Sequence, residues 1–466
     1  MTTRALRVAL LLVVTAVIAA VGFAVLGGGD DDGGAEEVAA APRPAPPTPR
    51  PPLPPPPEWP TGPIDPATRA AIDAVIDIPV GTRLDEFEAL VTAGDPRVAW
   101  QLVDQMRVTI GLPAETFASQ AVAELVGISQ IDARLAMDPD ADPERTGLAW
   151  ADWTDLLLAW DLPATDGYVD DKRTIYEQVD PGFAAFLTDD EELDWRRVTW
   201  GGVERDGIAT LVDPVVTDAD GADWLPDDET ILGVVVEGEA RAYPQRMLDV
   251  HEIAQDTLGG RSIHVTLCTL CGSAVAFDTT DVPGVGPLEL RTSGLLESSN
   301  KLMFDPASES LLRQFSGDAV TGELLAAGVE VPIIGLTVTS WGAWREAHPA
   351  TTVLAEDPGT GRTYRPGQLV ARDADGPIFP VGDTDLRLPP NSDVLGVIGP
   401  DGPIALSVAD LDAALADGDR VEAAGLVIAA SAAGPIITVD GEVIDPLFSR
   451  WFAWAQRHPD TAVWTG

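Results

Sequence analysis

A motif that occurs twice is the feature that most constrains the fold of this chain. The pattern W-x-A-W-x-x-x-H-P begins at Trp341 and again at Trp451. Upstream of the first copy, the stretch ILGVVVEGEA begins at Ile231, and it resembles the stretch VLGVIGPDGP upstream of the second copy. Such self-similarity indicates two related structural units, which we place at about residues 200–355 and 365–466.

Both units are expected to be rich in β-strands. From about residue 200, short apolar runs such as SIHVTLCTL and SAVAFDTT alternate with turns made of glycine, aspartate and proline, a pattern typical of strands. Glu237-Gly238 and Asp305-Pro306 have the composition of hairpin turns. The stretch MLDVHEIAQDTLGG, which contains His251, is predicted to be a helical or irregular insertion.

The region before these units is expected to be helical. Ile72, Val75 and Ile76 fall at helical spacing, and Asp95-Pro96 suits the start of a helix because aspartate can cap it and proline fits its first turn. We predict a small helical bundle for support or contacts and find no catalytic constellation in it. The preceding stretch PRPAPPTPRPPLPPPPEWP should be an extended spacer, because proline lacks the N–H that helices and sheets require.

The N-terminus resembles a membrane anchor. Arg4 and Arg7 precede an uncharged apolar run from Val8 to Leu26, and three aspartates follow it. The run is just long enough to span a bilayer as a helix, and the charges place the N-terminus in the cytoplasm and the bulk of the chain outside. A cleaved signal peptide is the rival interpretation. Outside the cytoplasm, a pair of cysteines can persist as a disulfide.

The charge excludes some partners. A net charge of -46 and a pI near 4.1 describe a surface that repels nucleic acid and anionic lipid. Lysine occurs only at Lys172 and Lys301, so arginine carries the remaining positive charge. We therefore expect the N-terminal helix to attach the chain to the membrane, and no nucleic-acid partner. A protein or small-molecule partner is not identified by the sequence.

Together these observations predict an α+β chain with five parts. They are an N-terminal membrane helix (1–29), an acidic and proline-rich stalk (30–65), a helical domain (66–195), a strand-rich domain (196–360) and a degenerate, cysteine-free repeat of it (361–466).

The only two cysteines, Cys268 and Cys271, form one C-x-x-C in HVTLCTLCGSA. In the leading hypothesis they bind zinc or copper together with His251, because thiolates and imidazole suit such ions. Glu252 or His264 would be a fourth ligand. In an extended strand His264 would lie ~13 Å from Cys268, so His251 is the better candidate.

Two other interpretations of the cysteines stay open. In one interpretation, the pair exchanges with disulfides outside the cytoplasm. One thiolate attacks the substrate disulfide, and its neighbour then resolves the mixed disulfide. Against this, the motif lies in a strand–turn–strand context rather than at a helix start. Alternatively, the pair forms a local disulfide or a buried thiol pair in a non-catalytic binding or scaffold module. The second unit has Ala430 and Ala433 at the matching positions, so the fold is expected not to need the thiols.

Other polar residues give weaker signals. Arg241, Asp305, Arg313 and Gln314 could line a pocket beside the cysteines, as could His264. The paired histidines of the repeated motif, at 348 and 458, are expected to be structural, because a histidine suits the last turn of a helix. No phosphate-binding loop and no G-x-S-x-G motif is present. The sequence names no reaction and leaves open whether the protein is an enzyme.

Several ordered blocks resemble the family known as domain of unknown function 3179. They are WGGVERDGI, ARAYP, HEI, VTLCTLCGSAVAFD, TSGLLESSNKLMFD and the first W-x-A-W-x-x-x-H-P motif, over about residues 195–355 and more weakly in the tail. The family's usual C-P-L-C, preceded by an aromatic residue, has Thr269 and Leu267 here, and its D-R-Q-T-x-S-x-W is replaced by residues 305–312. The resemblance implies only that His251, Glu252 and the two cysteines belong to a recurrent pattern.

Overall fold

The structure is a computed structural model with two compact units that divide between Leu187 and Thr188. It describes residues 52–76, 84–141, 149–189, 192–366, 377–418 and 420–466. The predicted anchor at 1–29 and the stalk up to residue 51 lie outside the described residues. Within the described ranges, no helix has both the length and the apolar character needed to cross a bilayer.

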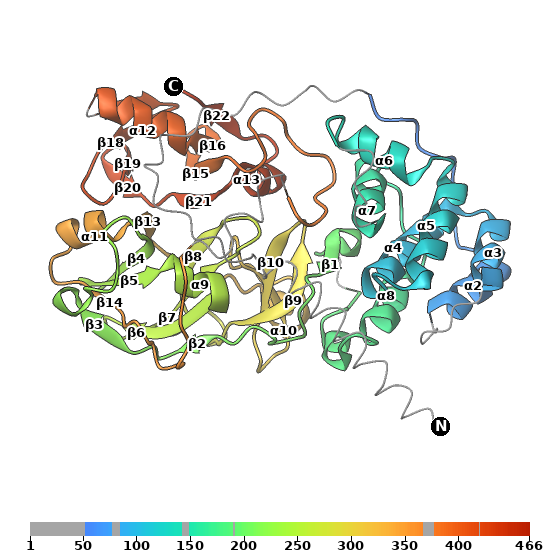
Figure 1. Ribbon diagram of the computed structural model, residues 1–466, viewed down its shortest axis with the longest axis horizontal. Coiled ribbons are helices and arrows are strands. Elements are labelled where there is room, and N and C mark those ends of the chain that lie inside the picture. The colour runs from blue at the N-terminus through green and yellow to red at the C-terminus, as the bar shows by residue number, and fades with distance from the viewer. Residues whose placement is uncertain (1–51, 77–83, 142–148, 190–191, 367–376, 419) are drawn as a thin grey trace, which may run out of the picture. The chain divides into compact units, whose positions relative to one another are not determined.

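The first unit consists of helices, as predicted (Figure 1). Local capping explains several of their ends. Asp95 caps the short helix that begins at Pro96 by accepting a hydrogen bond from Arg97 N, and Gly127 ends α5 in the left-handed conformation that glycine favours. The α-helices are α2 (Pro66–Ile76), α3 (Leu84–Ala93), α4 (Ala99–Val108), α5 (Pro113–Val126), α6 (Gln130–Met137), α7 (Ala149–Ala159) and α8 (Tyr168–Tyr176).

A buried lysine joins two of these helices. Lys172 of α8 is 1% exposed and donates to Asp104 of α4 at 2.8 Å, and Asp104 also accepts hydrogen bonds from Tyr168 and Tyr176. A buried charge needs such complete pairing, because its transfer from water is costly. The paired charges thus join α4 to α8 in the core of the first unit.

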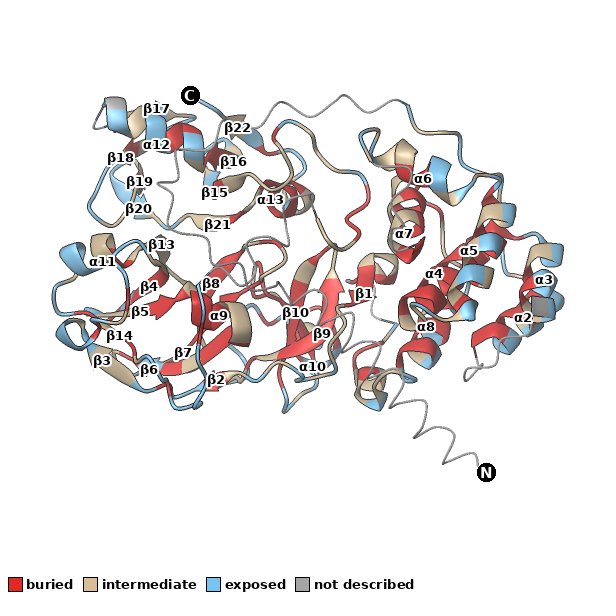
Figure 2. Ribbon diagram, in the orientation of Figure 1, coloured by how far each residue is buried: buried red, intermediate tan, exposed pale blue. Residues whose placement is uncertain are grey.

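The second compact unit, from Thr188 onward, contains both repeats of the sequence and is built mainly from strands. The strands begin right after a 3₁₀ turn, η3 (Trp195–Arg197). In Figure 2 the strands from β4 to β10 are largely buried, whereas α11 and α12 expose one side. The first part contains β1 (Val198–Trp200), β2 (Leu211–Val212), β3 (Val216–Asp218), β4 (Thr230–Val236), β5 (Glu239–Pro244), α9 (Gln245–His251), β6 (Ile253–Leu258), β7 (Arg261–Leu267), β8 (Ala274–Asp278), β9 (Arg291–Glu297), β10 (Asn300–Phe304), β11 (Leu311–Arg313), α10 (Gly322–Ala326), β12 (Ile333–Ile334), β13 (Leu336–Ser340), α11 (Trp341–Ala347) and β14 (Thr352–Leu354).

The remaining elements of the second unit follow residue 376. They are β15 (Asp393–Gly399), β16 (Gly402–Ser407), α12 (Val408–Asp417), β17 (Arg420–Ala423), β18 (Leu426–Ala429), β19 (Ile436–Val439), β20 (Glu442–Ile444), β21 (Leu447–Arg450), α13 (Trp451–Arg457) and β22 (Ala462–Trp464). The predicted α+β class is thus confirmed for the described residues. The stretch MLDVHEIAQDTLGG is part helix and part regular strand, α9 followed by β6, rather than an insertion.

The same order of paired strands occurs twice. The first part has the order β13-β4-β5-β14 and the second β21-β15-β16-β22, with matching directions. The register also matches, because Ile231 pairs with Pro244 as Val394 pairs with Ser407. Between β5 and β13, the strands β6, β7 and β8 form a meander, and between β16 and β21 so do β17, β18 and β19.

We call the two repeats, β1–β14 and β15–β22, the first and second halves of the second unit. The repeated W-x-A-W-x-x-x-H-P motif forms the closing helix of each half, α11 in the first and α13 in the second. The second tryptophan of each motif lies flat on a glycine of the central strand, Trp344 on Gly233 and Trp454 on Gly396. Its indole N–H donates to a threonine seven residues later, at 2.9 Å and 2.8 Å respectively. The histidine of each motif packs against the same tryptophan in a tilted arrangement, with ring centroids 4.1 Å and 4.2 Å apart. Both histidines therefore contact the structural core of their own half.

The two halves join through one sheet. Within the described residues this sheet has the order β2-β6-β7-β8-β21-β15-β16-β22, so β8 of the first half neighbours β21 of the second. The loop after β7 packs in a cluster with the closing helix α13, and Ala433 of the matching loop after β18 packs against Trp341 and Trp344 of α11. Each half thus covers the other's closing helix with the same loop.

Candidate functional site

The two cysteines lie in the loop between β7 and β8. The loop is closed by a hydrogen bond from Cys268 N to Ser273 O at 2.9 Å, and Gly272 turns it with a φ of 64°. Arg450 N, at the end of β21, donates to Cys271 O at 2.8 Å. Cys268 is 1% exposed and Cys271 is fully buried, and both are free thiols.

A chain of buried hydrogen bonds reaches Cys271. Gln314 donates its amide to Thr266 Oγ1 and Ser273 O, so its Oε1 accepts the Ser273 hydroxyl proton at 2.6 Å. The only proton of Ser273 Oγ is therefore committed, and this oxygen can only accept from the Cys271 thiol, 3.0 Å away. A Cys271 thiol can therefore donate its proton to Ser273 or to Cys268.

The turn between β9 and β10 covers the thiols from the other side. Asn300 Nδ2 donates to Cys271 Sγ at 3.0 Å, and Ser299 O lies 3.9 Å from Cys268 Sγ. Ser298 and Ser299 have φ angles of 46° and 64°, a left-handed backbone that is uncommon for serine. Among the described residues Ser299 Oγ has no hydrogen-bond partner although it is buried. Strained backbone and an unpaired polar atom occur together at functional sites more than elsewhere.

A buried ion pair lies beside Cys268. Lys301, 2% exposed, pairs with Glu252 at 2.5 Å and donates to Leu267 O at 3.1 Å. Glu252 also accepts a hydrogen bond from Thr269, the residue after Cys268. The positive charge favours a thiolate and the negative charge opposes it, so the pair sets the local electrostatic potential at the sulfur.

The two thiols have different pKa values. Burial raises the pKa of Cys268, but a hydrogen bond from Cys271 and the charge of Lys301 outweigh it and lower the pKa to about 7. Burial, followed by the interaction with Cys268, raises the pKa of Cys271 well above its ordinary value. Such a pair holds one proton and one negative charge near neutral pH, the state in which one sulfur is a nucleophile.

The structure does not bring His251 together with the cysteines. Its ring nitrogens contact Ala209 O at 2.6 Å and Tyr364 Oη at 2.7 Å, and burial lowers its pKa. Glu252 follows in a left-handed conformation, with a φ of 59°, and its side chain reaches Lys301 instead. No group of three or more His, Cys, Asp or Glu side chains is placed to hold a metal ion within the described ranges.

The other predicted residues divide between the site and distant contacts. His264 is buried against Thr279 and Leu290 N, and burial lowers its pKa to about 3. Arg241 pairs with Asp256 at 2.6 Å and so joins β5 to β6, whereas Asp305 accepts from the backbone and hydroxyl of Ser308 in the turn after β10.

Two of the predicted residues lie near the thiols. Gln314 belongs to the hydrogen-bond chain of Cys271, as described above. Arg313 lines a pocket next to it, with its guanidinium held by Glu297 at 2.6 Å and Asp318 at 2.6 Å.

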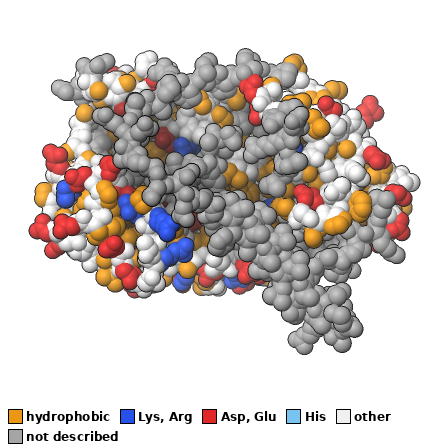
Figure 3. All heavy atoms as spheres, viewed as in Figure 1, with side chains coloured by type: hydrophobic (Ala, Val, Ile, Leu, Met, Phe, Trp, Pro, Cys, Tyr) orange, Lys and Arg blue, Asp and Glu red, His pale blue; other side chains and the backbone are white. Residues whose placement is uncertain are grey.

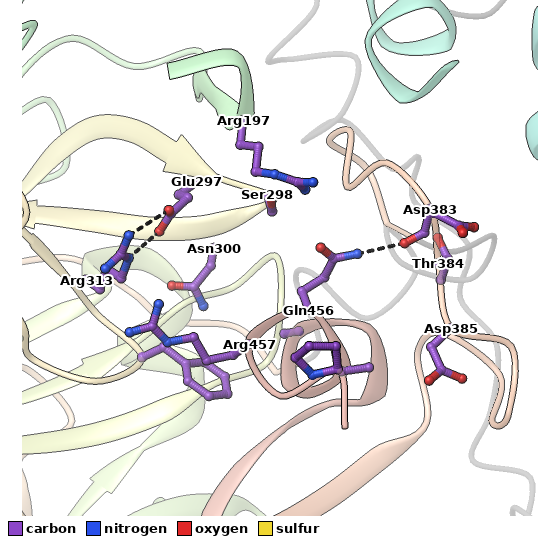
Figure 4. Close-up of a pocket in the computed structure, with 14 residues that line it drawn as sticks. Arg197, Glu297, Ser298, Asn300, Arg313, Asp383, Thr384, Asp385, Gln456 and Arg457 are labelled. Carbon is purple, nitrogen blue, oxygen red and sulfur yellow. Dashed lines mark hydrogen bonds and ion pairs between the residues drawn. The ribbon is translucent and has the colours of Figure 1, made fainter. Parts of the chain in front are cut away.

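This pocket has a volume of about 640 Å³ and lies between the two halves of the second unit. The first half contributes η3, the β9–β10 turn and the segment after β11, and the second contributes residues 383–385 and the end of α13 (Figure 4). Asn300 and Phe315 line the pocket and also touch the cysteine site, Asn300 through Cys271 Sγ and Phe315 through the shared apolar cluster. The pocket therefore approaches the thiols through these two side chains.

Sequence reasoning missed Ser273, Asn300 and Lys301 as parts of the site. Lys301 had a visible signal, because a lysine in an apolar strand is unusual in a chain with only two lysines. Ser298, Ser299 and Asn300 have turn composition, and nothing in their spacing links them to the cysteines. The contribution of α13 depends on a contact between segments about 180 residues apart, which a local pattern does not reveal.

The comparisons with known proteins agree with the resemblance seen in the sequence. A family model described as "Protein of unknown function (DUF3179)" matches residues 205–445, from the loop before β2 to the end of β20. The match includes both cysteines, Lys301, Gln314 and most of the second half. No curated protein and no solved structure matches the chain.

Proposed function

Since this chain belongs to the DUF3179 family, whose description assigns no reaction, we propose from the site itself that Cys268 and Cys271 form a redox-active dithiol that exchanges with disulfides. The observation that carries the proposal is the pairing of unlike thiols. Burial and the neighbouring Cys268 favour the thiol form of Cys271, which can donate to Ser273, while Cys268 lies beside Lys301. An attacking thiolate and a protonated neighbour are what such an exchange requires.

The proposed reaction has two steps. Cys268 thiolate attacks one sulfur of a substrate disulfide, so that a mixed disulfide forms and the other half leaves as a thiolate that takes up a proton. Cys271 then loses its proton and attacks Cys268 Sγ, which releases the second half as a thiol and closes the Cys268–Cys271 disulfide. The substrate gains two electrons and two protons; the Cys268 thiolate and Cys271 thiol together supply both electrons and one proton, and solvent supplies the other proton.

Several contacts support this reaction over the metal interpretation. Asn300 donates to the Cys271 sulfur, and this stabilises developing negative charge on it in the second step. Lys301 does the same for Cys268 in the first step. His251, the expected third metal ligand, is engaged by Ala209 and Tyr364, and Glu252 by Lys301.

The second half has a complementary role in this proposal. It is a degenerate copy of the first, with Ala430 and Ala433 in the loop that corresponds to the cysteine loop. The second half has no thiols of its own. Its closing helix α13 packs in one cluster with Cys268 and Cys271, so in this proposal it covers the thiols of the first half.

The location of the reaction is also a proposal. Residues 1–29 have the composition of an anchor that places the bulk of the chain outside the cytoplasm, where exchange partners in the disulfide form are available. Membrane fractionation, with protease treatment of intact cells, tests this: protection of the chain from the external protease would overturn it.

The reaction is tested on the full-length chain in glutathione redox buffers of varied ratio. After alkylation of free thiols, mass spectrometry should show one two-electron transition between the dithiol and an internal Cys268–Cys271 disulfide. Cys271→Ser should accumulate a mixed disulfide with glutathione on Cys268, and Cys268→Ser should accumulate much less. A pair that keeps one redox state at every ratio would overturn the proposal. One tightly bound copper or zinc ion per chain, with thiols inert until it is removed, would instead favour metal binding.

A further inference from the structure

The pocket between the two halves suggests a substrate class for the dithiol. We propose that it binds a small-molecule disulfide that carries carboxylate groups, and this inference rests on the exchange reaction proposed above. Three observations support it: the burial of the thiols, the position of the pocket, and the arginines at its wall.

Burial of the thiols limits the size of the substrate. Cys268 is 1% exposed and Cys271 is fully buried, so a disulfide on the surface of a folded protein cannot reach either sulfur without opening the site. The pocket of about 640 Å³ falls in the range of sites for small molecules. Asn300 forms the boundary between this space and Cys271, because it lines the pocket and contacts the sulfur at 3.0 Å. Asn300 therefore separates the pocket from Cys271, the neighbour of the attacking sulfur.

The charged side chains that line the pocket differ in how closely their ion-pair partners approach them. Arg313 is neutralised by Glu297 and Asp318, and Asp385 is paired with Arg387 at 2.7 Å. These pairs leave the pocket with little net charge from the residues named.

Arg197 and Arg457 are held more loosely. The Nε atom of Arg197 lies 3.7 Å from Asp194, longer than a hydrogen bond, and Arg457 shares Asp318 with Arg313 at 3.2 Å. Both side chains are more than a third exposed. In Figure 4 the Arg197 side chain extends from η3 and the Arg457 side chain from α13, on the two sides of the space. Guanidinium groups bind carboxylates through paired hydrogen bonds, which gives geometric specificity.

The rest of the surface opposes such a ligand. The chain carries a net charge of -46, and Figure 3 shows acidic side chains scattered over the face in view. Long-range electrostatics therefore repel a dianion. A preference for a carboxylate-bearing disulfide over a neutral one would therefore have to come from local contacts. Loss of that preference in arginine variants tests whether Arg197 and Arg457 make these contacts.

The experiment compares two disulfide reagents on the full-length, reduced chain in detergent at pH 8. One is 5,5′-dithiobis(2-nitrobenzoate), which carries two carboxylates, and the other is 4,4′-dithiodipyridine, which is neutral. Because Cys268 and Cys271 are the only cysteines, the released chromophore reports on this site alone. We expect Arg197→Gln and Arg457→Gln each to lower the rate constant for the dicarboxylate by about tenfold, as for loss of a charge-assisted hydrogen bond, and to leave the neutral reagent within about twofold.

Arg420→Gln is the matched control. Arg420 is an exposed arginine of β17 that does not line the pocket, and its loss changes the net charge by the same amount. It should leave both rate constants unchanged. The neutral reagent also shows in each variant that the site is intact.

The outcomes separate the two proposals. If both reagents react and neither arginine variant changes their ratio, the substrate class is wrong while the dithiol reaction stands. If neither reagent reacts with the native chain but both react after unfolding in urea, the exchange reaction itself is wrong. A dicarboxylate rate that falls equally in Arg420→Gln would assign the effect to net charge and would also overturn the inference.

Discussion

Replacing Lys301 by methionine and Glu252 by glutamine should move the pKa of the Cys268 thiol in opposite directions. The two side chains touch each other beside Cys268, and the carboxylate raises the thiol pKa while the ammonium lowers it. A general disturbance of the loop would shift the pKa in the same direction in both variants. Opposite shifts therefore identify electrostatics as the cause.

The magnitude follows from the shift in the native chain. The pKa of Cys268 is lowered from 9.0 to about 7 against the effect of burial, which favours the thiolate by roughly 3 kcal/mol. Lys301→Met removes the ammonium, one of the main lowering interactions, so the pKa should rise by at least one unit, or about 1.4 kcal/mol. Glu252→Gln leaves Lys301 without its carboxylate, so the thiolate becomes its nearest counter-charge and the pKa should fall below 7.

The pKa is measured from thiolate absorbance near 240 nm and from the pH dependence of the iodoacetamide reaction, in a Cys271→Ser background that isolates one sulfur. Because that background removes the hydrogen bond from Cys271, its own pKa is the reference for both shifts. The double variant Lys301→Met/Glu252→Gln is the control, since it leaves no unpaired buried charge. A Cys268 pKa that stays within about 0.3 unit in Lys301→Met, well inside the scatter of perturbed thiols, would refute the assigned role of the lysine.

Three further predictions concern stability. Between pH 6 and pH 8 the free energy of unfolding should rise by roughly 1 kcal/mol through Cys268. The lowered pKa of Cys268 gives a contribution that is complete above 9.0 and is lost as the pH falls through 7. Urea unfolding of Cys268→Ser should lack this rise. Gly396→Ala should lower the free energy of unfolding by at least about 2 kcal/mol in the same assay, since the new Cβ would lie 2.1 Å from a ring carbon of Trp454. Gly399→Ala in the same strand should cost much less, because the atom nearest to its new Cβ lies at 3.5 Å. Equal losses in the two variants would contradict the packing argument. Ser273→Ala should cost about 1–3 kcal/mol because it leaves Gln314 Oε1 without its donor, and an unchanged urea midpoint would show that the hydrogen-bond chain is replaced by water.

The strand pairing of the second unit could be anticipated from the repeated sequence. Trp344 and Trp454 each leave room only for a glycine on the strand that they cover. This packing requires both the motif and the glycine-bearing strand in each half, so the two features recur together in the sequence. The hairpin at Glu237-Gly238 could also be anticipated, because both residues adopt positive φ in a two-residue connection. Short-range patterns of this kind depend on backbone geometry that the residue type itself dictates.

The partners of the site residues could not be anticipated in the same way. His251 and Glu252 are adjacent, and the left-handed backbone at Glu252 sends one side chain to Tyr364 and the other to Lys301. A single dihedral angle decides this, and no spacing rule encodes it. The cover of Cys271 by α13 likewise depends on how the two halves join through β8 and β21.

The burial of both lysines has a practical consequence for labelling this protein. Lys172 and Lys301 are 1% and 2% exposed, and the chain has no other lysine. Amine-reactive dyes, biotin esters and aldehyde fixatives would therefore reach neither lysine side chain while the chain is folded. Labelling of Lys172 would report unfolding of the first unit, and labelling of Lys301 would report unfolding of the second.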